Sequence, residues 1–315
     1  FEQGKRLVVE ANPHFPGSPP SIRRIELVPG SSEELIRRFE AGEVDVIYPN
    51  HVSLEQARAL RGRRPEAVHI SPSALMVRLQ PDMAHPVLSR REVRRAILMA
   101  IDRRALATEV YGTRAQVAHG PVLGDLPQGA VEHAYDPESA RQAITEAGVT
   151  DVGIPLLHGD SVTSRQLAAS IAASLEAIGL RPVPRVVERR ARVEMGIRKR
   201  HGGLLLRPMR ISRDGNVLRD WNVPITDGRY DPTTRHDAFD DWVAALAARE
   251  SRAVHPDRRQ QLRQELAVAY TERLPTIPLV FTTERVIAHP RLRGWDRDPQ
   301  ELFGAGVEGW FFLPD

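Results

Sequence analysis

The chain has 315 residues, of which 41% are hydrophobic and 27% are charged, and its formal net charge at pH 7 is +3. This length favours a folded protein with two globular units. Cysteine is absent, which excludes disulfides, thiolate catalysis and cysteine-ligated metal centres. No run of about 18 apolar residues occurs, so no membrane span is predicted. The first ten residues also lack the pattern of a signal peptide, and we expect any such signal to lie upstream.

The basic side chains are almost all arginines, because Lys5 and Lys199 are the only lysines. The densest basic stretch is 185–213, and a nucleic-acid patch is one interpretation of it. Glu188 and Glu194 interrupt the stretch, however, and no aromatic residues alternate with the arginines. We therefore expect a solvated surface that binds no nucleic acid.

The first fifty residues alternate between strand and helix patterns. Strands are predicted at 6–11 and 22–28, on either side of a loop rich in proline and glycine. A helix follows over 31–41 and ends at Gly42, and 44–49 has the composition of a buried strand. Such strand-helix-strand units build mainly parallel sheets.

The next elements are a weak helix at 53–60 and two separate strands at 67–70 and 74–79. The strongest helix pattern of the chain comes after them. We expect Ser89 to cap this helix and Gly112 to close it.

The second half repeats the alternation of strands and helices. A helix is expected between Asp136 as N-cap and Gly148, and 154–207 contains a second strand-helix-strand unit with a further helix and strand. The chain then continues with helices at about 237–249 and 256–273, and 275–290 is predicted as two strands joined by a turn.

No known catalytic motif occurs in the sequence. There is no GxSxG elbow, Walker loop, HExxH or GxGxxG, so we predict a protein that is not an enzyme and needs no cofactor. His236 and Asp240 stand four apart and could share a helix face as metal ligands. The aspartates of this segment also fit the first turns of a helix, and we therefore expect no metal.

Five segments, in order, resemble the extracytoplasmic solute-binding proteins of the dipeptide, oligopeptide and nickel ABC-importer family. The V-R-x-A to A-I-D pattern is the clearest of them, and it lies in VRRAILMAIDRRALATEVYG. The matching segments are 4–17, 39–49, 93–112, 135–149 and 273–295.

This resemblance implies an α/β periplasmic-binding-protein fold of class II and the dipeptide-binding-protein type, with two lobes of mixed sheets flanked by helices. Lobe one would comprise 1–95, as a partial lobe, and 283–315, and lobe two would comprise 96–282. The chain resembles the C-terminal part of such proteins, which carry a further segment before it.

The resemblance also implies a function. The chain would be the receptor of an ABC importer, capturing peptides or peptide-like solutes in the cleft between the lobes and delivering them to a permease of the inner membrane. Such a receptor is expected to be a monomer in the periplasm or elsewhere outside the cytoplasmic membrane. The alternative is the solute-sensing module of a bacterial transcription regulator, which would have a helix-turn-helix upstream.

Peptide binders of the family often hold the amino terminus of the peptide on an aspartate, in a segment like G-W-x-x-D-Y-P-D-P. The corresponding stretch here is RPMRISRDGNVLRDW. Asp214 and Asn216 match that segment with a shift of one residue, so Asp214 is the candidate anchor. The added arginines of this stretch, Arg207, Arg210 and Arg213, would favour a carboxylate or another anion.

Two further side chains are candidates for ligand contact. Gln80 stands where the strand of the family usually ends in asparagine, and its amide could bind a ligand backbone. Trp221 follows Asp214 and could line the cleft, although core packing is the more common fate of such a residue.

Overall fold

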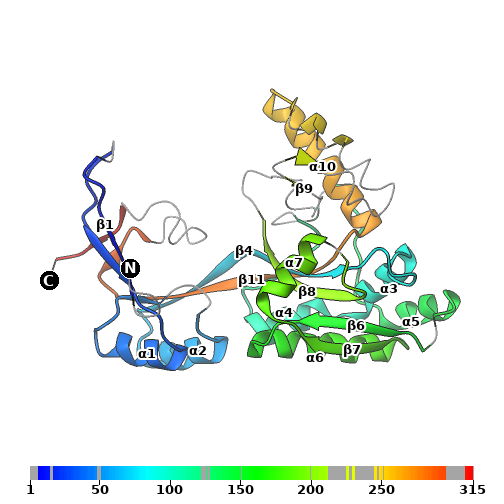
Figure 1. Ribbon diagram of the computed structural model, residues 1–315, viewed down its shortest axis with the longest axis horizontal. Coiled ribbons are helices and arrows are strands. Elements are labelled where there is room, and N and C mark those ends of the chain that lie inside the picture. The colour runs from blue at the N-terminus through cyan, green and yellow to red at the C-terminus, as the bar shows by residue number, and fades with distance from the viewer. Residues whose placement is uncertain are drawn as a thin grey trace. The chain divides into compact units, whose positions relative to one another are not determined.

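The structure is a computed structural model of the chain. It describes residues 6–14, 17–47, 51–121, 126, 128–149, 151–198, 200–211, 225–226, 229–230, 245–246, 248–250, 252–295 and 309–314. The chain divides into two compact units (Figure 1). Unit 1 combines Phe1–Ser73 with Thr283–Asp315, and unit 2 is Ala74–Thr282. The first change of unit therefore falls at residue 73, whereas the expected first lobe extends to residue 95.

The described residues of unit 1 form short strands and two helices. Its helices begin at serine caps, because Ser31 accepts a hydrogen bond from the backbone of Glu34 and Ser53 forms a capping box with Gln56. The elements are β1 (Leu7–Glu10), β2 (Arg24–Leu27), α1 (Ser32–Glu40), β3 (Val46–Ile47), α2 (Leu54–Arg63), β12 (Leu292–Arg293) and β13 (Phe311–Phe312).

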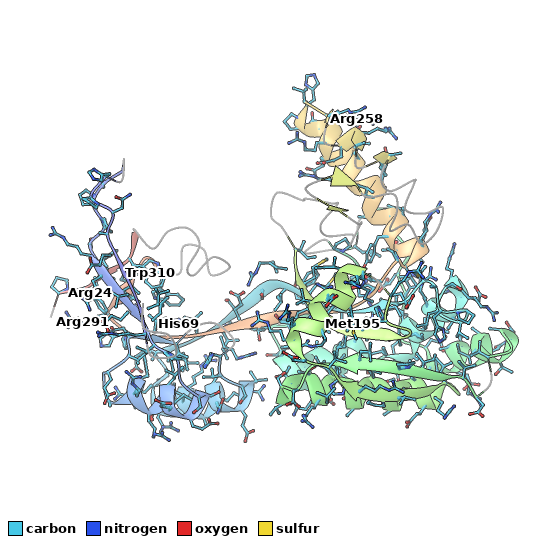
Figure 2. The ribbon with its side chains drawn as sticks, viewed as in Figure 1. Arg24, His69, Met195, Arg258, Arg291 and Trp310 are labelled. Carbon is cyan, nitrogen blue, oxygen red and sulfur yellow. The ribbon has the colours of Figure 1, made fainter. Side chains whose placement is uncertain are left out.

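Among the described residues, two apolar clusters stabilise unit 1. The helices bury Leu35, Phe39 and Leu60 beside β3. In the other cluster Trp295 and Trp310 are buried, and the ring of His69 meets that of Trp295 edge-on, with the ring centres 4.6 Å apart. Figure 2 labels His69 and Trp310 in this unit.

The parallel sheet expected for residues 22–49 is wrong. β2 pairs antiparallel with β1, and β3 pairs antiparallel with the late strand β11 (Ile277–Ala288) through Ile47 and Ile287. The partner of each strand thus comes from outside the local strand-helix-strand unit.

Unit 2 is built on a mixed sheet. Its strands are ordered β11-β4-β8-β6-β7, and β5 pairs with β11. β6 is parallel to β7 and to β8, whereas β4 is antiparallel to β8, so the expected mixed sheet flanked by helices is confirmed. The strand bounds are β4 (Val68–Pro81), β5 (Gln116–Val117), β6 (Gly153–His158), β7 (Arg181–Val186) and β8 (Leu204–Arg210).

Helices pack against both faces of this sheet. One face contributes Leu79, Leu156 and Leu206 to a core that also contains the apolar side of α6. The other face meets α7, and Figure 1 shows α6 beside β6 and β7 and α7 beside β8. The helices of unit 2 are α3 (Arg91–Ala100), α4 (Arg103–Tyr111), α5 (Pro137–Glu146), α6 (Val162–Ala177), α7 (Arg189–Arg198) and α10 (Pro256–Arg273). The predicted 237–249 helix lies mostly outside the described residues, although 245–246 and 248–250 are helical.

Three predicted elements differ from the observed ones. β4 and β11 are each one continuous strand rather than two, and each begins in one unit and ends in the other. The helix pattern after Ser89 forms two helices, α3 and α4, because Ile101 is extended and Asp102 caps α4 by accepting from the backbone N–H of Ala105.

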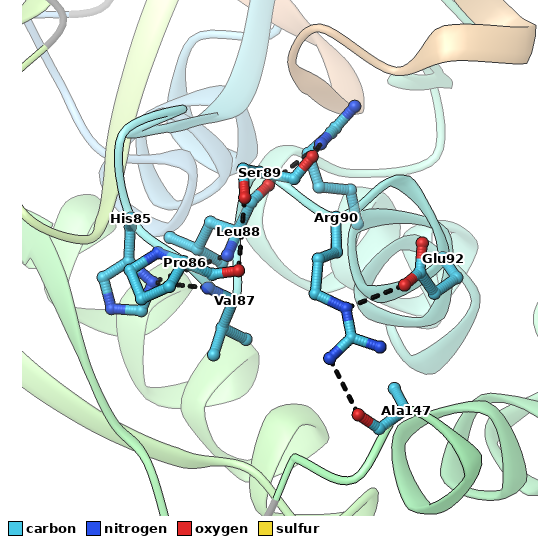
Figure 3. A network of polar contacts seen from close by, with 9 residues as sticks. His85, Pro86, Val87, Leu88, Ser89, Arg90, Glu92 and Ala147 are labelled. Atoms are coloured by element: carbon cyan, nitrogen blue, oxygen red, sulfur yellow. Dashed lines mark hydrogen bonds and ion pairs between the residues drawn. The ribbon is translucent and has the colours of Figure 1, made fainter.

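Ser89 does not cap α3. The N-cap is Arg90, which makes no side-chain cap bond, and the Ser89 hydroxyl donates to the carbonyl of Pro86. Figure 3 shows this turn, with the His85 imidazole accepting from the backbone N–H groups of Val87 and Leu88. The turn satisfies its own polar groups and leads directly into the helix.

Several residues of the family-like motifs have structural roles. The buried guanidinium of Arg94 donates to four backbone carbonyls, those of Leu88, Ser89, Arg273 and Leu274. Arg103 donates to the carbonyls of Ala118 and His133, and burial lowers its pKa to about 10. Asp136 caps α5. These motifs therefore fix the path of the chain through unit 2.

Candidate functional site

The face of the unit 2 sheet that meets α7 carries polar side chains, and we call it the polar face. Arg78 on β4 lies directly opposite Arg207 on β8, and Gln80 lies opposite Leu205. Because opposite residues of an antiparallel pair project from the same face, Arg78, Gln80 and Arg207 share this face.

Gln80 is buried, with 1% of its surface exposed. Its Nε2 donates to the carbonyl of Gly196 on α7 at 3.0 Å, and its Oε1 accepts from Arg207 Nη1 at 3.4 Å. The Gln80 amide thus joins β4 to α7 and orients Arg207. A ligand would bind this amide only by replacing Gly196 or Arg207 as its hydrogen-bonding partner.

Arg210 does not lie beside Gln80. It is exposed and stands opposite Leu75 at the end of β8. Gln80 pairs five positions away along the ladder, a separation of about 17 Å, and faces the other side of the sheet. The other predicted site residues, Arg213, Asp214, Asn216 and Trp221, lie outside the described residues.

A second buried polar group lies where β4 and α10 meet. Arg78 has no exposed surface, and it lies beside the hydroxyl of Tyr270, which also bonds to Thr276. Burial raises the pKa of Tyr270, while Arg78 and Thr276 act in the opposite direction. The tyrosine is thereby kept neutral as a hydrogen-bonding partner.

Asp82 fastens the loop before β8 to the end of β4. Its carboxylate accepts from the backbone N–H of Ala84 at 2.9 Å and from those of His201 and Gly202 at 2.7 Å each. Burial raises the pKa of Asp82, but these backbone donors outweigh it and hold the pKa below its usual value. The ionised carboxylate therefore sets where β8 begins.

The sequence did not single out Arg192 of α7, which lies close to Arg207. Arg192 Nε donates to the carbonyl of Val187 at 3.1 Å. Burial lowers the pKa of Arg207, and the positive charge of Arg192 lowers it further. Arg192 belongs to the dense basic stretch, but its place in the sequence does not indicate that it lies near Arg207.

In the described part of the chain, no group of three or more His, Cys, Asp or Glu side chains could hold a metal ion. Among the described residues, no helix has the length and apolar character needed to cross a bilayer. The segment containing His236 and Asp240 lies outside them.

Comparison with known proteins gives a consistent result. Residues 1–212 match the sequence profile of bacterial extracellular solute-binding proteins, family 5 Middle. A probable D,D-dipeptide-binding periplasmic protein, DdpA, of Escherichia coli is 22% identical over 188 residues. A putative ABC transporter peptide-binding protein of Brucella ovis is 31% identical over 110 residues. The matches cover 57% and 33% of this chain, but only 36% and 21% of the two relatives.

Solved structures share the fold. NikA from Brucella suis, in complex with Fe(III)-EDTA, superposes with a TM-score of 0.81 at 18% identity and covers 99% of this chain and 66% of its own. DppA from Helicobacter pylori, in complex with the peptide STSA, has a TM-score of 0.74 at 18% identity and covers 94% and 58%. These likenesses confirm the class II periplasmic-binding-protein fold of the peptide-binding type.

Proposed function

Because the chain belongs to the bacterial extracellular solute-binding proteins of family 5, we propose that it is the receptor component of an ABC importer that captures a peptide or peptide-like solute. The match over residues 1–212 carries this proposal. The names of the two relatives support the solute class, and neither name is that of a transcription regulator. The solute is bound and then delivered unchanged to a membrane permease, without a cofactor.

The two compact units correspond to two lobes in this proposal. Unit 1 is formed from both ends of the chain, and unit 2 is one continuous stretch, as the resemblance implies for lobes one and two. The receptor acts as a monomer outside the cytoplasmic membrane, and it binds no nucleic acid.

The proposed solute contacts come from the stretch after β8. Asp214 is the anchor for an amino group of the solute, with Asn216 and Trp221 beside it in sequence. Arg210 and Arg213 supply positive charge on the same stretch. Gln80 contributes from β4 if its amide exchanges one of its protein partners for a ligand.

Native mass spectrometry of the protein, purified without refolding, tests the function directly. A carried-over peptide or peptide-like molecule is the expected result, and its affinity is then measured by calorimetry. Release of a chemically altered molecule would contradict the receptor function, as would the absence of binding to any peptide of a diverse mixture.

Asp214→Ala tests the anchor. The variant should lose affinity for the identified solute and keep its melting temperature without ligand. Asp257→Ala, in the exposed first turn of α10, is the matched control and should bind like the wild type. Equal affinity in all three proteins would show that Asp214 is not an anchor.

A further inference from the structure

Two guanidinium groups lie together on the polar face, beyond the carboxyl end of β6 and beside the middle of β8. Leu157 of β6 pairs with Leu205 of β8 in parallel register. Gly159, which directly follows β6, and Arg207, within β8, are each two residues further on and therefore stand at the same level. Neighbouring strands are about 4.8 Å apart. Ligands of open α/β sheets bind outside the carboxyl ends of the parallel strands, and Gly159 lies just beyond that end of β6.

Arg192 approaches this edge from α7, the helix on which Figure 2 labels Met195. Its guanidinium lies against the backbone of Gly159, where an added Cβ would be 2.9 Å from both Cζ and Nη2 of Arg192. The absence of a side chain at residue 159 is what allows this approach.

Arg207 reaches the same region from β8. A Cβ added at Gly196 would be 1.6 Å from Arg207 Nη1, so the guanidinium fills the space that a side chain at residue 196 would occupy. The carbonyl of Gly196 accepts from Gln80, which in turn accepts from Arg207. Gln80 and Gly196 therefore hold Arg207 in place under α7.

These two positive charges lack a negative partner in the described parts of the chain. Neither Arg192 nor Arg207 forms an ion pair there, although other arginines of unit 2 do, such as Arg198 with Glu194 at 2.7 Å. Both arginines are partly buried. Bringing two like charges together away from water is unfavourable unless an anion compensates them.

We propose that Arg192 and Arg207 form an anion-recognition site that selects solutes with net negative charge, bound through a carboxylate or a phosphate group. Guanidinium forks match both groups in geometry and form charge-assisted hydrogen bonds with them. This inference rests on the proposed function, because it names the chemical class of the solute that the receptor takes.

The test uses tripeptides of equal length, namely Ala-Ala-Ala, Ala-Lys-Ala, Ala-Glu-Ala and Ala-phosphoserine-Ala, titrated by calorimetry. The wild type should bind the two acidic peptides more tightly than the neutral one and bind the lysine peptide most weakly. The glutamate and phosphoserine peptides distinguish the carboxylate from the phosphate source.

Arg207→Gln and Arg192→Gln should each weaken the acidic peptides by about 30-fold or more, as expected when one partner of a desolvated charge pair is removed. Binding of Ala-Ala-Ala, whose single carboxylate is the terminal one, should weaken less, so the preference for the acidic peptides should shrink. Gly196→Ala keeps both charges but displaces the Arg207 guanidinium, so this variant should also lose the preference for acidic peptides. Arg189→Gln, at an exposed position of the same helix, is the control and should keep it.

The outcomes separate this inference from the proposed function. Tight binding of peptides without a preference for acidic ones, or a preference that survives both arginine variants, would overturn the anion site and leave the receptor function standing. If no peptide binds, thermal shifts with inorganic phosphate and succinate decide. The peptide-receptor function has then already failed. Stabilisation that both arginine variants abolish supports the anion site by itself, and no stabilisation overturns the anion site as well.

Discussion

Replacing Asp82 by asparagine should destabilise unit 2 by about 3 kcal/mol. The carboxylate accepts three backbone N–H bonds, from Ala84, His201 and Gly202. The amide of asparagine has only one oxygen, and its NH2 group would face at least one backbone donor. Hydrogen bonds to a charged acceptor contribute about 1.5–3 kcal/mol each, and an unsatisfied buried donor costs about 1–3 kcal/mol.

The effect of Asp82→Asn should depend on pH in a defined direction. The pKa of Asp82 is held below its usual value, so its contribution to stability is fully present above the unfolded-state pKa of about 3.9. This contribution is lost as the pH falls through the folded-state pKa. The difference in unfolding free energy between wild type and variant should therefore be largest near neutral pH and shrink below about pH 4.

Urea unfolding at several pH values measures this difference, and hydrogen exchange at the amides of His201 and Gly202 locates it. A local probe is needed because a chain with two units need not unfold in one transition. Asp257→Asn is the control and should change stability by less than about 1 kcal/mol. Unchanged unfolding and unchanged amide protection in Asp82→Asn would refute the role of the carboxylate.

Two other substitutions test the packing of unit 2. Arg94→Met leaves four backbone carbonyls without the guanidinium donor. Urea unfolding should show a free energy of unfolding that is lower by about 3–5 kcal/mol. A loss under about 1 kcal/mol would contradict the structural role of Arg94. Gly203→Ala places a Cβ 2.2 Å from the carbonyl oxygen of Pro155, so its melting temperature should fall by the equivalent of about 1–3 kcal/mol. Gly62→Ala is the comparison, because it lies in α2 with no atom near the added Cβ, and it should stabilise the protein by up to about 1 kcal/mol. Equal melting temperatures for the two glycine variants would show that residue 203 does not need to be glycine for the close approach to Pro155.

The sequence predicted the order and type of most elements in unit 2, since helix caps and apolar periodicity are local signals. It failed where polar residues are buried. Thr282, Thr283, Glu284 and Arg285 resemble a turn between two strands, yet all four are buried within β11. Glu284 accepts a hydrogen bond from Ser73, and Arg285 donates to the carbonyl of Val52. These partners are remote in sequence, so no local pattern reveals them.

The candidate site was harder to predict than the fold, for a related reason. Gln80 and Arg210 were both expected to contact ligand, but the pairing register places them on opposite faces of the sheet. Register also brings Arg207 level with Gly159 and so beside Arg192. The residues that identify the family, such as Arg94 and Asp102, hold backbone segments in place. Their conspicuous pattern therefore predicts architecture and gives no information on which solute is bound.

The division of the chain has a consequence for biogenesis. Unit 2 is one continuous stretch, whereas unit 1 needs residues from both ends of the chain. During synthesis the ribosome completes Ala74–Thr282 before it produces the part of β11 that belongs to unit 1, Thr283–Ala288, and domains generally fold as units as they emerge. β3 can pair only after Ile287, the partner of Ile47, has been synthesised. Closing the long loop between these two residues is slow. The nascent polypeptide should therefore acquire a structured middle while its beginning still depends on chaperones.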